Sequence, residues 1–457
     1  MNSLSVNQIA QMAGGTLAAI SRDAILERVV TDSRQVKPGD CFVALRGENF
    51  DAHQFLPEVI ARGATAVLVD QPYTSTVPVI KVSDTLVGLQ SLAKNYRSTL
   101  KTQVIGITGS NGKTSTKDLA ATVFGQKHAV TKTAGNLNNH IGLPLSVLAI
   151  DDSHQFAILE MGMNHPGEIA PLAAISQVNA AIITNIGVAH IEFMRTQGAI
   201  ALEKGMLAES VPANGCVILN ANDPFSAGIA KRCQGKILLA GIDQGDIMAT
   251  RLLAEPDGTH FLATYQNETL EAWLPVSGRH MVANALLAVA AAVFFGIPFQ
   301  EAVASLGHVR LTGGRLETRK LGDYTIIDDT YNANPDSMVA ALLTLREMPV
   351  AGRRIAVLGA MGELGFYAEE GHRKVGEAAS GIDLLITVGT TARWIAEAAS
   401  RHDALEIIQV SDTQEAAQKL AHVLQSGDTI LCKGSRSARM EKVLSELENL
   451  IHPSTVH

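Results

Sequence analysis

The sequence predicts an α/β protein with three domains. Its 457 residues are too many for one hydrophobic core, and about 150 residues per domain suggests three. Short β-branched apolar segments alternate with helical segments along most of the chain, as in parallel sheets covered by helices. A glycine-rich turn at residues 108–115 indicates a central phosphate-binding loop. We expect a small α/β substrate domain (1–100), a central P-loop ATPase-type parallel sheet (101–313) and a Rossmann-like doubly wound sheet (314–457).

The composition argues against several classes of protein. The 37 basic and 45 acidic residues give a net charge of −8, which does not suggest a nucleic-acid partner. Four scattered cysteines without a CxxC pair imply neither a disulfide framework nor a zinc site. The N-terminus has no signal-peptide pattern. Residues 281–300 are uncharged, but they are rich in alanine and end in Gly-Ile-Pro, which favours a buried helix over membrane insertion. These features predict a cytoplasmic protein.

The first region combines short elements with polar loops. We expect helices at residues 5–12, 55–62 and 87–96, and strands at 41–45 and 66–69. The loops mix hydroxyl, carboxylate and cationic side chains, which suits recognition of a phosphorylated ligand, although solvated turns have the same composition. The candidate substrate-binding residues here are Asp32, Ser33, Arg34 and Arg46.

The glycine-rich turn follows an expected strand at 104–107 and precedes an expected helix at 118–124. Glycines let successive backbone N–H groups face one anion, and the helix N-terminus adds partial positive charge. Lys113 can reach the outer phosphates of a nucleotide, and Thr114 can place its hydroxyl on Mg²⁺. Ile107 stands where the general motif has its first glycine. The predicted ATP-binding residues of this loop are Gly109, Ser110, Asn111, Gly112, Lys113, Thr114 and Ser115.

Other strand ends of the middle region also carry polar groups. Glu160 ends an expected strand at 156–159, and a carboxylate beside the P-loop strand is well placed for Mg²⁺. His190 follows an expected strand at 181–186, where a structural histidine is as common as a metal ligand. An asparagine-rich loop offers amides that suit a sugar or phosphate, although turns also favour asparagine. Its candidate substrate-binding residues are Asn136, Asn138 and Asn139.

The rest of the middle region continues the alternation of elements. We expect a helix at 199–210, a strand at 217–219 and an antiparallel strand at 262–272, which could belong to a side sheet, before the buried helix at 281–300. Glu203 and Lys204, taken alone, indicate a solvated face of the first of these helices.

The last region has the pattern of a doubly wound sheet. Strands are expected at 324–327, 355–358, 384–388, 407–410 and 429–431, separated by helical segments. Such folds bind ligands at the carboxyl ends of their strands. The polar loops at those ends are residues 328–335, 359–365 and 433–436.

Together these residues resemble the Mur ligase family, ATP-dependent amide-forming enzymes of peptidoglycan synthesis, and the resemblance extends along the whole chain. The residues that carry it are the loop 108–115, Glu160-Met161-Gly162, His190, Glu203-Lys204, His280, Asn284, Arg315 and Asp329. Residues 32–40 resemble the uridine-binding domain of the tripeptide-adding and dipeptide-adding ligases. Residues 329–338, and residues 433–436 together with Met440-Glu441, are similar to the dipeptide-adding member. The sequence lacks the Asp-Asn-Pro-Arg tetrapeptide of the diaminopimelate-adding ligases. The nearest alternative in the family is the ligase that adds the third residue.

The resemblance implies a reaction and its cofactors. The terminal carboxylate of UDP-N-acetylmuramoyl-tripeptide attacks the γ-phosphate of ATP, and the amine of D-alanyl-D-alanine attacks the resulting acyl phosphate. Two Mg²⁺ ions are implied, with Thr114, Glu160, His190 and a carbamylated Lys204 as ligands. Lys113, Lys204 and His190 are the implied catalytic residues.

The resemblance also assigns ligands to domains. Asn284, Arg315 and Asp329 join the ATP site, and the dipeptide lies on the last domain of a bacterial, cytoplasmic monomer. Two competing functions remain: a P-loop nucleotide-driven switch or transport ATPase, and a catalytically idle binding protein on a ligase scaffold. The candidate dipeptide-binding residues are Asn332, Asn334, Ser435 and Arg436.

Overall fold

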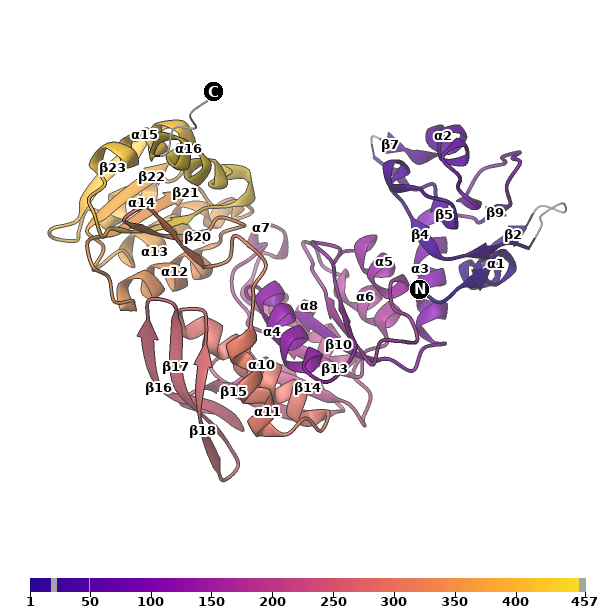
Figure 1. Ribbon diagram of the computed structural model, residues 1–457, viewed down its shortest axis with the longest axis horizontal. Coiled ribbons are helices and arrows are strands. Elements are labelled where there is room, and N and C mark those ends of the chain that lie inside the picture. Colours follow the sequence, from indigo (N-terminus) through magenta and orange to yellow (C-terminus); the bar gives the residue numbers. More distant parts are fainter. Residues whose placement is uncertain (18–22, 49, 452–457) are drawn as a thin grey trace.

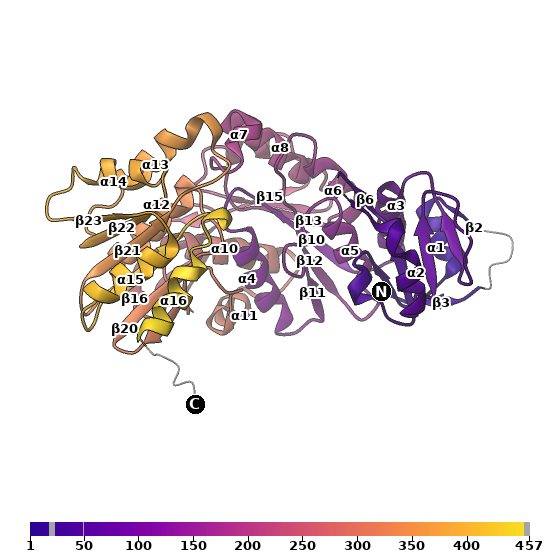
Figure 2. The same ribbon diagram turned by 90° about the horizontal axis from the view of Figure 1, so that it is seen from above.

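The computed structural model describes residues 1–17, 23–48 and 50–451. It contains three lobes in chain order, and Figure 2 shows the first and last lobes at opposite ends of an elongated molecule. The lobes are built on sheets of five, nine and six strands, which confirms the predicted three-domain α/β class. The chain passes from the first to the middle lobe between Arg97 and Gln103, and from the middle to the last lobe between His308 and Glu317 (Figure 1). The domain bounds 1–100, 101–313 and 314–457 stay a prediction.

The five-stranded sheet of the first lobe has the order β2-β9-β8-β5-β4, and only β2 is antiparallel to its neighbour. Helix α1 begins one residue after the predicted start, because Ser5 is its N-cap and forms a capping box with Gln8. A short 3-10 turn occupies the start of the helix expected at 55–62. The elements are α1 (Val6–Ala13), β2 (Thr16–Leu17), β4 (Arg28–Val30), β5 (Asp40–Val43), α2 (Leu56–Ala61), β8 (Ala66–Val69), β9 (Val79–Lys81) and α3 (Thr85–Arg97), with the pairs β1 (Leu4–Ser5)/β3 (Ile25–Leu26) and β6 (Arg46–Gly47)/β7 (Phe50–Asp51).

The nine-stranded sheet of the middle lobe has the order β11-β12-β10-β13-β14-β15-β16-β17-β18. The first seven strands in this order, from β11 to β16 and including β10, are parallel to their neighbours. Strands β17 and β18 extend the sheet in antiparallel pairing. The strands are β10 (Gln103–Thr108), β11 (Val130–Lys132), β12 (Phe156–Glu160), β13 (Ala180–Ile183), β14 (Cys216–Asn220), β15 (Lys236–Ile242), β16 (Ile247–Glu255), β17 (Gly258–Tyr265) and β18 (Glu268–Leu274). The helices are α4 (Lys113–Gly125), α5 (Gly142–Leu148), α6 (Ile169–Ser176), α7 (Ile191–Met194), α8 (Gln197–Glu209), α9 (Ser226–Ala230), α10 (Arg279–Phe294) and α11 (Phe299–Ala304).

Three expectations for the middle lobe need correction. Helix α4 begins at Lys113, five residues before the expected start, because the phosphate loop passes directly into the first helical turn. The strand expected at 262–272 is a hairpin of β17 and β18, which extends the main sheet. The helix expected at 281–300 ends at Phe294, where Gly296 has φ of 86° and Pro298 prevents continuation.

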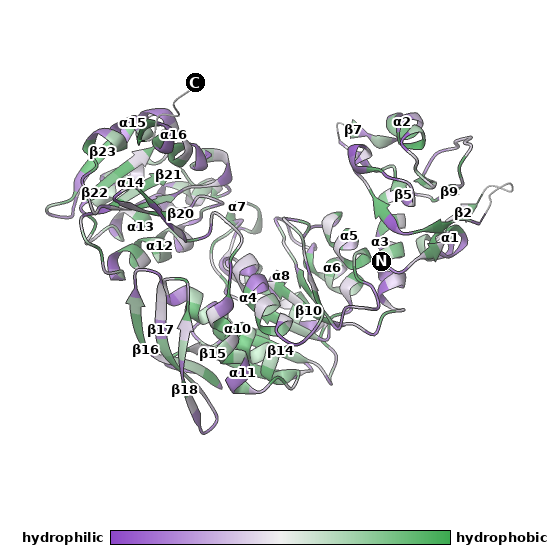
Figure 3. Ribbon diagram, viewed as in Figure 1, coloured by the Kyte–Doolittle hydropathy of each residue, from purple (hydrophilic) through white to green (hydrophobic). Residues whose placement is uncertain are grey.

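Helix α10 is nevertheless buried, as the sequence predicts. Ala285 to Ala292 are fully buried, and Figure 3 shows the hydrophobic character of this helix beside the middle sheet. Within 1–17, 23–48 and 50–451, no helix is both long and apolar enough to cross a membrane.

The six-stranded sheet of the last lobe has the order β19-β20-β24-β21-β22-β23, in which only β19 is antiparallel. Successive strand residues alternate between two apolar clusters, so the sheet is buried on both faces, as in a doubly wound fold. The elements are β19 (Glu317–Leu321), β20 (Tyr324–Asp329), α12 (Pro335–Glu347), β21 (Arg354–Gly359), α13 (Ala368–Glu377), β22 (Leu384–Val388), α14 (Arg393–Ala399), β23 (Glu406–Val410), α15 (Thr413–Val423), β24 (Thr429–Lys433) and α16 (Glu441–Ile451).

The first lobe is joined to the middle lobe through helix α3, which packs against α5 and α6. The fully buried Tyr96 donates its hydroxyl to the carbonyl of Ile150 at 2.6 Å. The Arg97 guanidinium, 5% exposed, donates to the carbonyls of Ser176 at 3.0 Å and Thr102 at 2.9 Å. The joint between the first and middle lobes therefore combines helix packing with buried hydrogen bonds.

Candidate active site

A cavity of about 1290 Å³ lies between the middle and last lobes, at the carboxyl ends of their parallel strands. Its wall combines the phosphate loop, the asparagine-rich loop and the three polar strand ends of the last lobe. Of the predicted site residues it brings together Ser110, Asn111, Gly112, Lys113, Thr114, Ser115, Asn136, Asn138, Asn139, Glu160, His190, Asn284, Arg315, Asp329, Asn332, Asn334, Ser435 and Arg436.

Two glycines of the phosphate loop are required by close approach. Gly109 has φ of 152°, and a Cβ there would lie 1.8 Å from the Thr184 hydroxyl. Gly112 precedes α4 with φ of 78°, and its Cβ would lie 2.6 Å from the side-chain amide of Asn284. The loop is therefore pressed against β13 and α10, with the N-terminus of α4 at the cavity.

Lys113 folds back over the loop. Its Nζ donates to the carbonyl of Gly109 at 2.8 Å. Burial is the main cause that lowers the pKa of Lys113, and the carboxylate of Glu160 opposes this effect. The lysine is thus held beside the place where a phosphate would accept its hydrogen bonds.

Glu160 ends β12 directly beside the P-loop strand, where Ile107 is its register partner. One carboxylate oxygen accepts from the Thr114 hydroxyl and the other from the Asn138 amide, each at 2.8 Å. Glu160 is 3% exposed, so its charge is held in place by these two donors. A carboxylate and a hydroxyl at this spacing fit a hard divalent cation beside the phosphates.

Lys204 differs from its sequence-based interpretation as part of a solvated helix face. Its side chain on α8 is fully buried, and its Nζ has no hydrogen-bond partner among the residues that the structure describes. The neighbouring Glu203 is also buried, and its two oxygens accept from the backbone N–H groups of Gly167 and Ile169, at 2.8 Å each. Burial and then the charge of Lys113 lower the pKa of Lys204 well below its ordinary value, and the charge of Glu203 acts against this.

His190 follows β13 and takes a left-handed backbone conformation with φ of 62°. Its Nδ1 lies 2.5 Å from Oε2 of Glu363, which belongs to the last lobe. This close contact with His190 is the main cause that lowers the pKa of Glu363. Glu363 was not among the predicted site residues, although it lies in one of the three polar strand-end loops that the sequence indicates.

The last lobe reaches the phosphate loop with two further side chains. Arg315 donates to the Thr114 hydroxyl at 3.2 Å and stacks 3.8 Å over the ring of Tyr331. The amide of Asn334 donates to the side chain of Asn111 at 2.7 Å, and Asn334 also caps α12. The phosphate loop is therefore in direct contact with both sides of the cavity.

Strand ends β20 and β24 form a second polar group. Lys433 lies 2.6 Å from Asp329 and donates to the Asn332 carbonyl at 2.9 Å. Burial raises the pKa of Asp329, and the charge of Lys433 acts against this. Lys433 was missed as an individual site residue, although it opens the predicted loop 433–436. The Ser435 hydroxyl donates to the carbonyl of Ala360, whereas the side chain of Arg436 is 69% exposed.

The candidate residues of the first lobe lie outside this cavity, as the described residues outline it. Arg34 pairs with Asp32 at 2.8 Å, and its hydrogen bonds lower the pKa of that carboxyl. Arg46 lies 3.0 Å from Asp70 and 3.3 Å from Asp51. Ser33 belongs to the same 3-10 turn as Arg34. Their role in binding substrate stays a prediction.

The residues of this site can bind divalent cations only if other groups supply further oxygen ligands. No group of three or more His, Cys, Asp or Glu side chains with metal-site geometry occurs in the described part of the chain. Glu160 and Thr114 supply one pair of ligands. The unpaired amine of Lys204 supplies none unless it is modified, since an ammonium or amine cannot replace a carboxylate.

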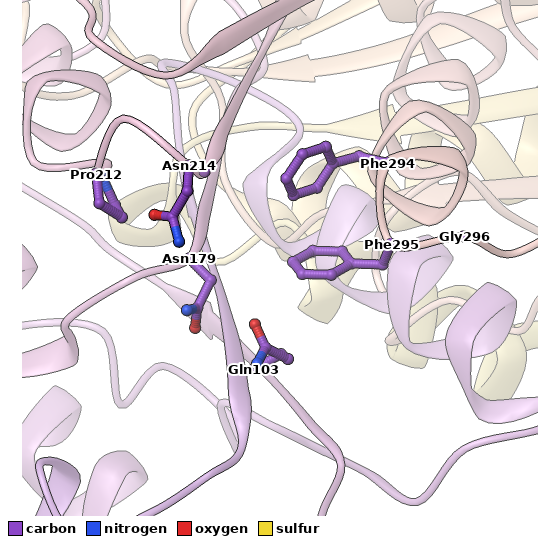
Figure 4. A pocket seen from close by; sticks show the side chains of 8 residues that line it. Gln103, Asn179, Pro212, Asn214, Phe294, Phe295 and Gly296 are labelled. Carbon is purple, nitrogen blue, oxygen red and sulfur yellow. The ribbon is translucent and has the colours of Figure 1, made fainter.

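A second, smaller cavity of about 400 Å³ lies at the amino ends of the parallel strands β10, β13 and β14. Figure 4 shows the side chains that line it. The rings of Phe294 and Phe295 at the end of α10 face the amides of Gln103, Asn179 and Asn214. Because none of its described lining residues is charged or nucleophilic, this cavity lacks the groups for phosphate or acid–base chemistry.

Comparison with known proteins agrees with this architecture. Family models match over most of the chain: "Mur ligase family, catalytic domain" at residues 26–97, "Mur ligase middle domain" at 107–292 and "Mur ligase, glutamate ligase domain" at 314–436. The UDP-N-acetylmuramoyl-tripeptide–D-alanyl-D-alanine ligase of Bacillus subtilis is 37% identical, covering 97% of this chain and 98% of the relative. That of Escherichia coli is 36% identical, covering 98% and 99%.

Solved structures extend the similarity to three dimensions. A crystal structure of MurF from Acinetobacter baumannii has a TM-score of 0.91 at 32% identity, covering 98% of this chain and 99% of that chain. MurF from Thermotoga maritima in complex with ADP has a TM-score of 0.84 at 28% identity, covering 93% and 98%. With three matching family models and relatives this similar along their full length, the chain belongs to the Mur ligase family.

Proposed function

We propose that this protein is an ATP-dependent ligase that joins D-alanyl-D-alanine to UDP-N-acetylmuramoyl-tripeptide, a step of peptidoglycan precursor synthesis that releases ADP and phosphate. The observation that carries the proposal is the full-length identity of 36–37% to ligases with this activity. The phosphate loop in the cavity supplies the nucleotide site, and the ADP complex of a related MurF supports its use of ATP.

The chemistry requires activation, because a carboxylate is a poor electrophile at neutral pH. Attack of the tripeptide carboxylate on the γ-phosphate gives an acyl phosphate, which the dipeptide amine then opens to form the amide. The protein contributes mainly alignment and neutralisation of charge. Lys113 exchanges its hydrogen bond to Gly109 for the outer phosphates, where its charge stabilises the transferred group.

Two Mg²⁺ ions, when bound, would spread the charge that develops on the transferred phosphoryl group. Thr114 and Glu160 would hold one ion, and His190 with a carbamate on Lys204 the other. The carbamate forms when the neutral Nζ amine adds to CO₂ and loses a proton, which gives an anion with two oxygens. The unpaired, buried Nζ and the lowered pKa of Lys204 support this assignment.

The substrates are divided among the lobes. The first lobe would hold the uridine end through Asp32 and Arg34, while the last lobe would hold the dipeptide, with the exposed side chain of Arg436 beside its carboxylate. Closure of the last lobe would then assemble the site. The protein would act as a monomer in the bacterial cytoplasm.

A substrate panel tests the proposal. Phosphate release is measured with ATP and either UDP-N-acetylmuramoyl-dipeptide or the tripeptide ending in diaminopimelate or lysine, each with single amino acids or D-alanyl-D-alanine. We expect turnover only with a tripeptide and the dipeptide together. Turnover with the UDP-muramoyl-dipeptide and one amino acid would identify the ligase that adds the third residue. ATP hydrolysis that needs neither substrate would instead indicate a nucleotide-driven switch.

A further inference from the structure

Glu363 makes a contact that the reaction scheme above does not use. It lies in the loop after β21 of the last lobe, and its Oε2 is 2.5 Å from Nδ1 of His190 on the middle lobe. The Nδ1 atom has no other partner in the described ranges, and the close pair lies outside standard hydrogen-bond geometry. The contact therefore depends on how the two lobes meet.

The backbone around this pair is shaped for the contact. Both His190 and Glu363 have left-handed conformations, with φ of 62° and 57°. The N–H of Glu192 donates to the Glu363 carbonyl at 3.4 Å, and a Cβ on Gly365 would lie 2.9 Å from the Glu192 side chain. The two loops are thus packed together at the backbone, and left-handed non-glycine residues persist only where the surroundings enforce them.

The chemistry of imidazole gives the contact a consequence. A neutral imidazole carries its proton on one nitrogen and a lone pair on the other. A carboxylate beside Nδ1 favours the proton there, which leaves Nε2 as the atom that can bind a cation. Histidines that bind metals commonly have such a carboxylate partner, and its loss typically weakens metal binding about 10–100-fold.

We propose that Glu363 is a positioning residue that holds the Nδ1–H tautomer of His190 when the last lobe lies on the middle lobe. The inference rests on the proposed function only in giving His190 a cation to bind. It means that the lobe that carries the dipeptide also completes a cation ligand on the lobe that carries ATP. Binding of the last substrate and ordering of the second cation are then linked through one side chain.

The test reads the tautomer directly in the full-length, metal-free protein. Long-range ¹H–¹⁵N spectra of ¹⁵N-histidine-labelled protein are recorded at a pH where imidazole is neutral, and His190 is assigned from its loss in His190→Gln. We expect the Nδ1–H form in the wild type and a shift towards Nε2–H in Glu363→Ala. Glu363→Gln keeps the size and one acceptor oxygen and should shift less. Glu370→Gln, an exposed carboxylate of the same lobe, serves as the matched control and should not shift.

A second measurement follows Mn²⁺ binding by electron paramagnetic resonance with a non-hydrolysable ATP analogue. Glu363→Ala should weaken the second Mn²⁺ roughly 10–100-fold and leave the first unchanged. An unchanged His190 tautomer in Glu363→Ala would overturn the proposal. So would a raised KM for the dipeptide with unchanged tautomer and Mn²⁺ binding, because Glu363 would then be a substrate contact. The tautomer is read without turnover, whereas failure of the proposed function would appear in the wild-type substrate panel.

Discussion

Replacing Lys204 with methionine should stabilise the protein while it abolishes turnover. Methionine has a similar length and no polar head, so it fills the site of a fully buried side chain whose Nζ has no partner among the described residues. A buried, unsatisfied polar group costs about 1–3 kcal/mol. For a domain of this size, each kcal/mol moves the melting temperature by roughly 2–4 °C. We therefore expect a rise of several degrees together with loss of the carbamate.

The sign of the pH dependence follows from the lowered pKa of Lys204. In the unfolded chain the amine titrates near its ordinary value of about 10.4. Between the folded and unfolded pKa values the unfolded chain binds more protons, so the stability of the wild type rises with pH across this window. The methionine variant lacks this contribution. Its advantage over the wild type should be greatest below the folded-state pKa and shrink, as the pH approaches about 10.4, to the part that comes from burying the neutral, unpaired amine.

Melting curves in CO₂-depleted buffer at several pH values measure the effect, and phosphate release measures turnover. In ¹³C-bicarbonate, a carbamate signal of the wild type should be absent from the variant. Lys204→Arg, which cannot form the carbamate in this way, should be as inactive as Lys204→Met, and acetate should partly rescue Lys204→Ala. A lower melting temperature for Lys204→Met at neutral pH would show that the amine is paired in the folded protein. Wild-type turnover by Lys204→Arg would refute the carbamate.

Four further substitutions separate roles in binding, chemistry and folding. Lys113→Ala should lower turnover roughly 10²-fold or more with little change in melting temperature, and near-normal turnover would contradict the P-loop assignment. Arg436→Ala should raise the KM for the dipeptide and leave that for ATP unchanged, with the reverse pattern moving Arg436 to the nucleotide site. Gly112→Ala should weaken nucleotide binding in calorimetry, because its Cβ would lie 2.6 Å from the Asn284 amide. Arg97→Met should lower the free energy of unfolding by at least about 1–3 kcal/mol in urea titrations, because buried carbonyls lose their donor.

Periodicity and strand-end chemistry predicted much of the architecture and of the cavity. Glu160 is predicted from its place at the end of a buried parallel strand, whereas Asp329 is predicted individually from the family resemblance. The fold places both at the cavity because both end strands of parallel sheets. Element ends were less accurate. The end of α10 could have been predicted from Gly296 and Pro298. The turn at Gln266 and Asn267, which separates β17 from β18, could not be predicted from the pattern of apolar residues alone.

The contacts around Lys204 and Glu363 could not be predicted from the residues next to them in the sequence. The sequence shows a carboxylate, Glu203, directly beside Lys204 and so suggests an ion pair. In the structure Glu203 instead accepts hydrogen bonds from backbone N–H groups more than thirty residues away. Glu363 of the last lobe contacts His190 of the middle lobe, and the two residues are far apart in the sequence. Such contacts depend on how whole sheets and loops pack, which no short window of sequence specifies.

The joint at Arg97 bears on how this protein could be re-engineered. Its guanidinium donates to the carbonyls of Leu100 and Thr102, in the connection between α3 and the P-loop strand, and to the carbonyl of Ser176 on α6. A chimera in which the first hundred residues are replaced by a segment without this arginine would leave the carbonyls of Thr102 and Ser176 without this hydrogen-bond donor, next to the P-loop strand. Exchange of substrate specificity by module swapping should therefore keep α3 with the middle lobe and place the crossover before residue 85.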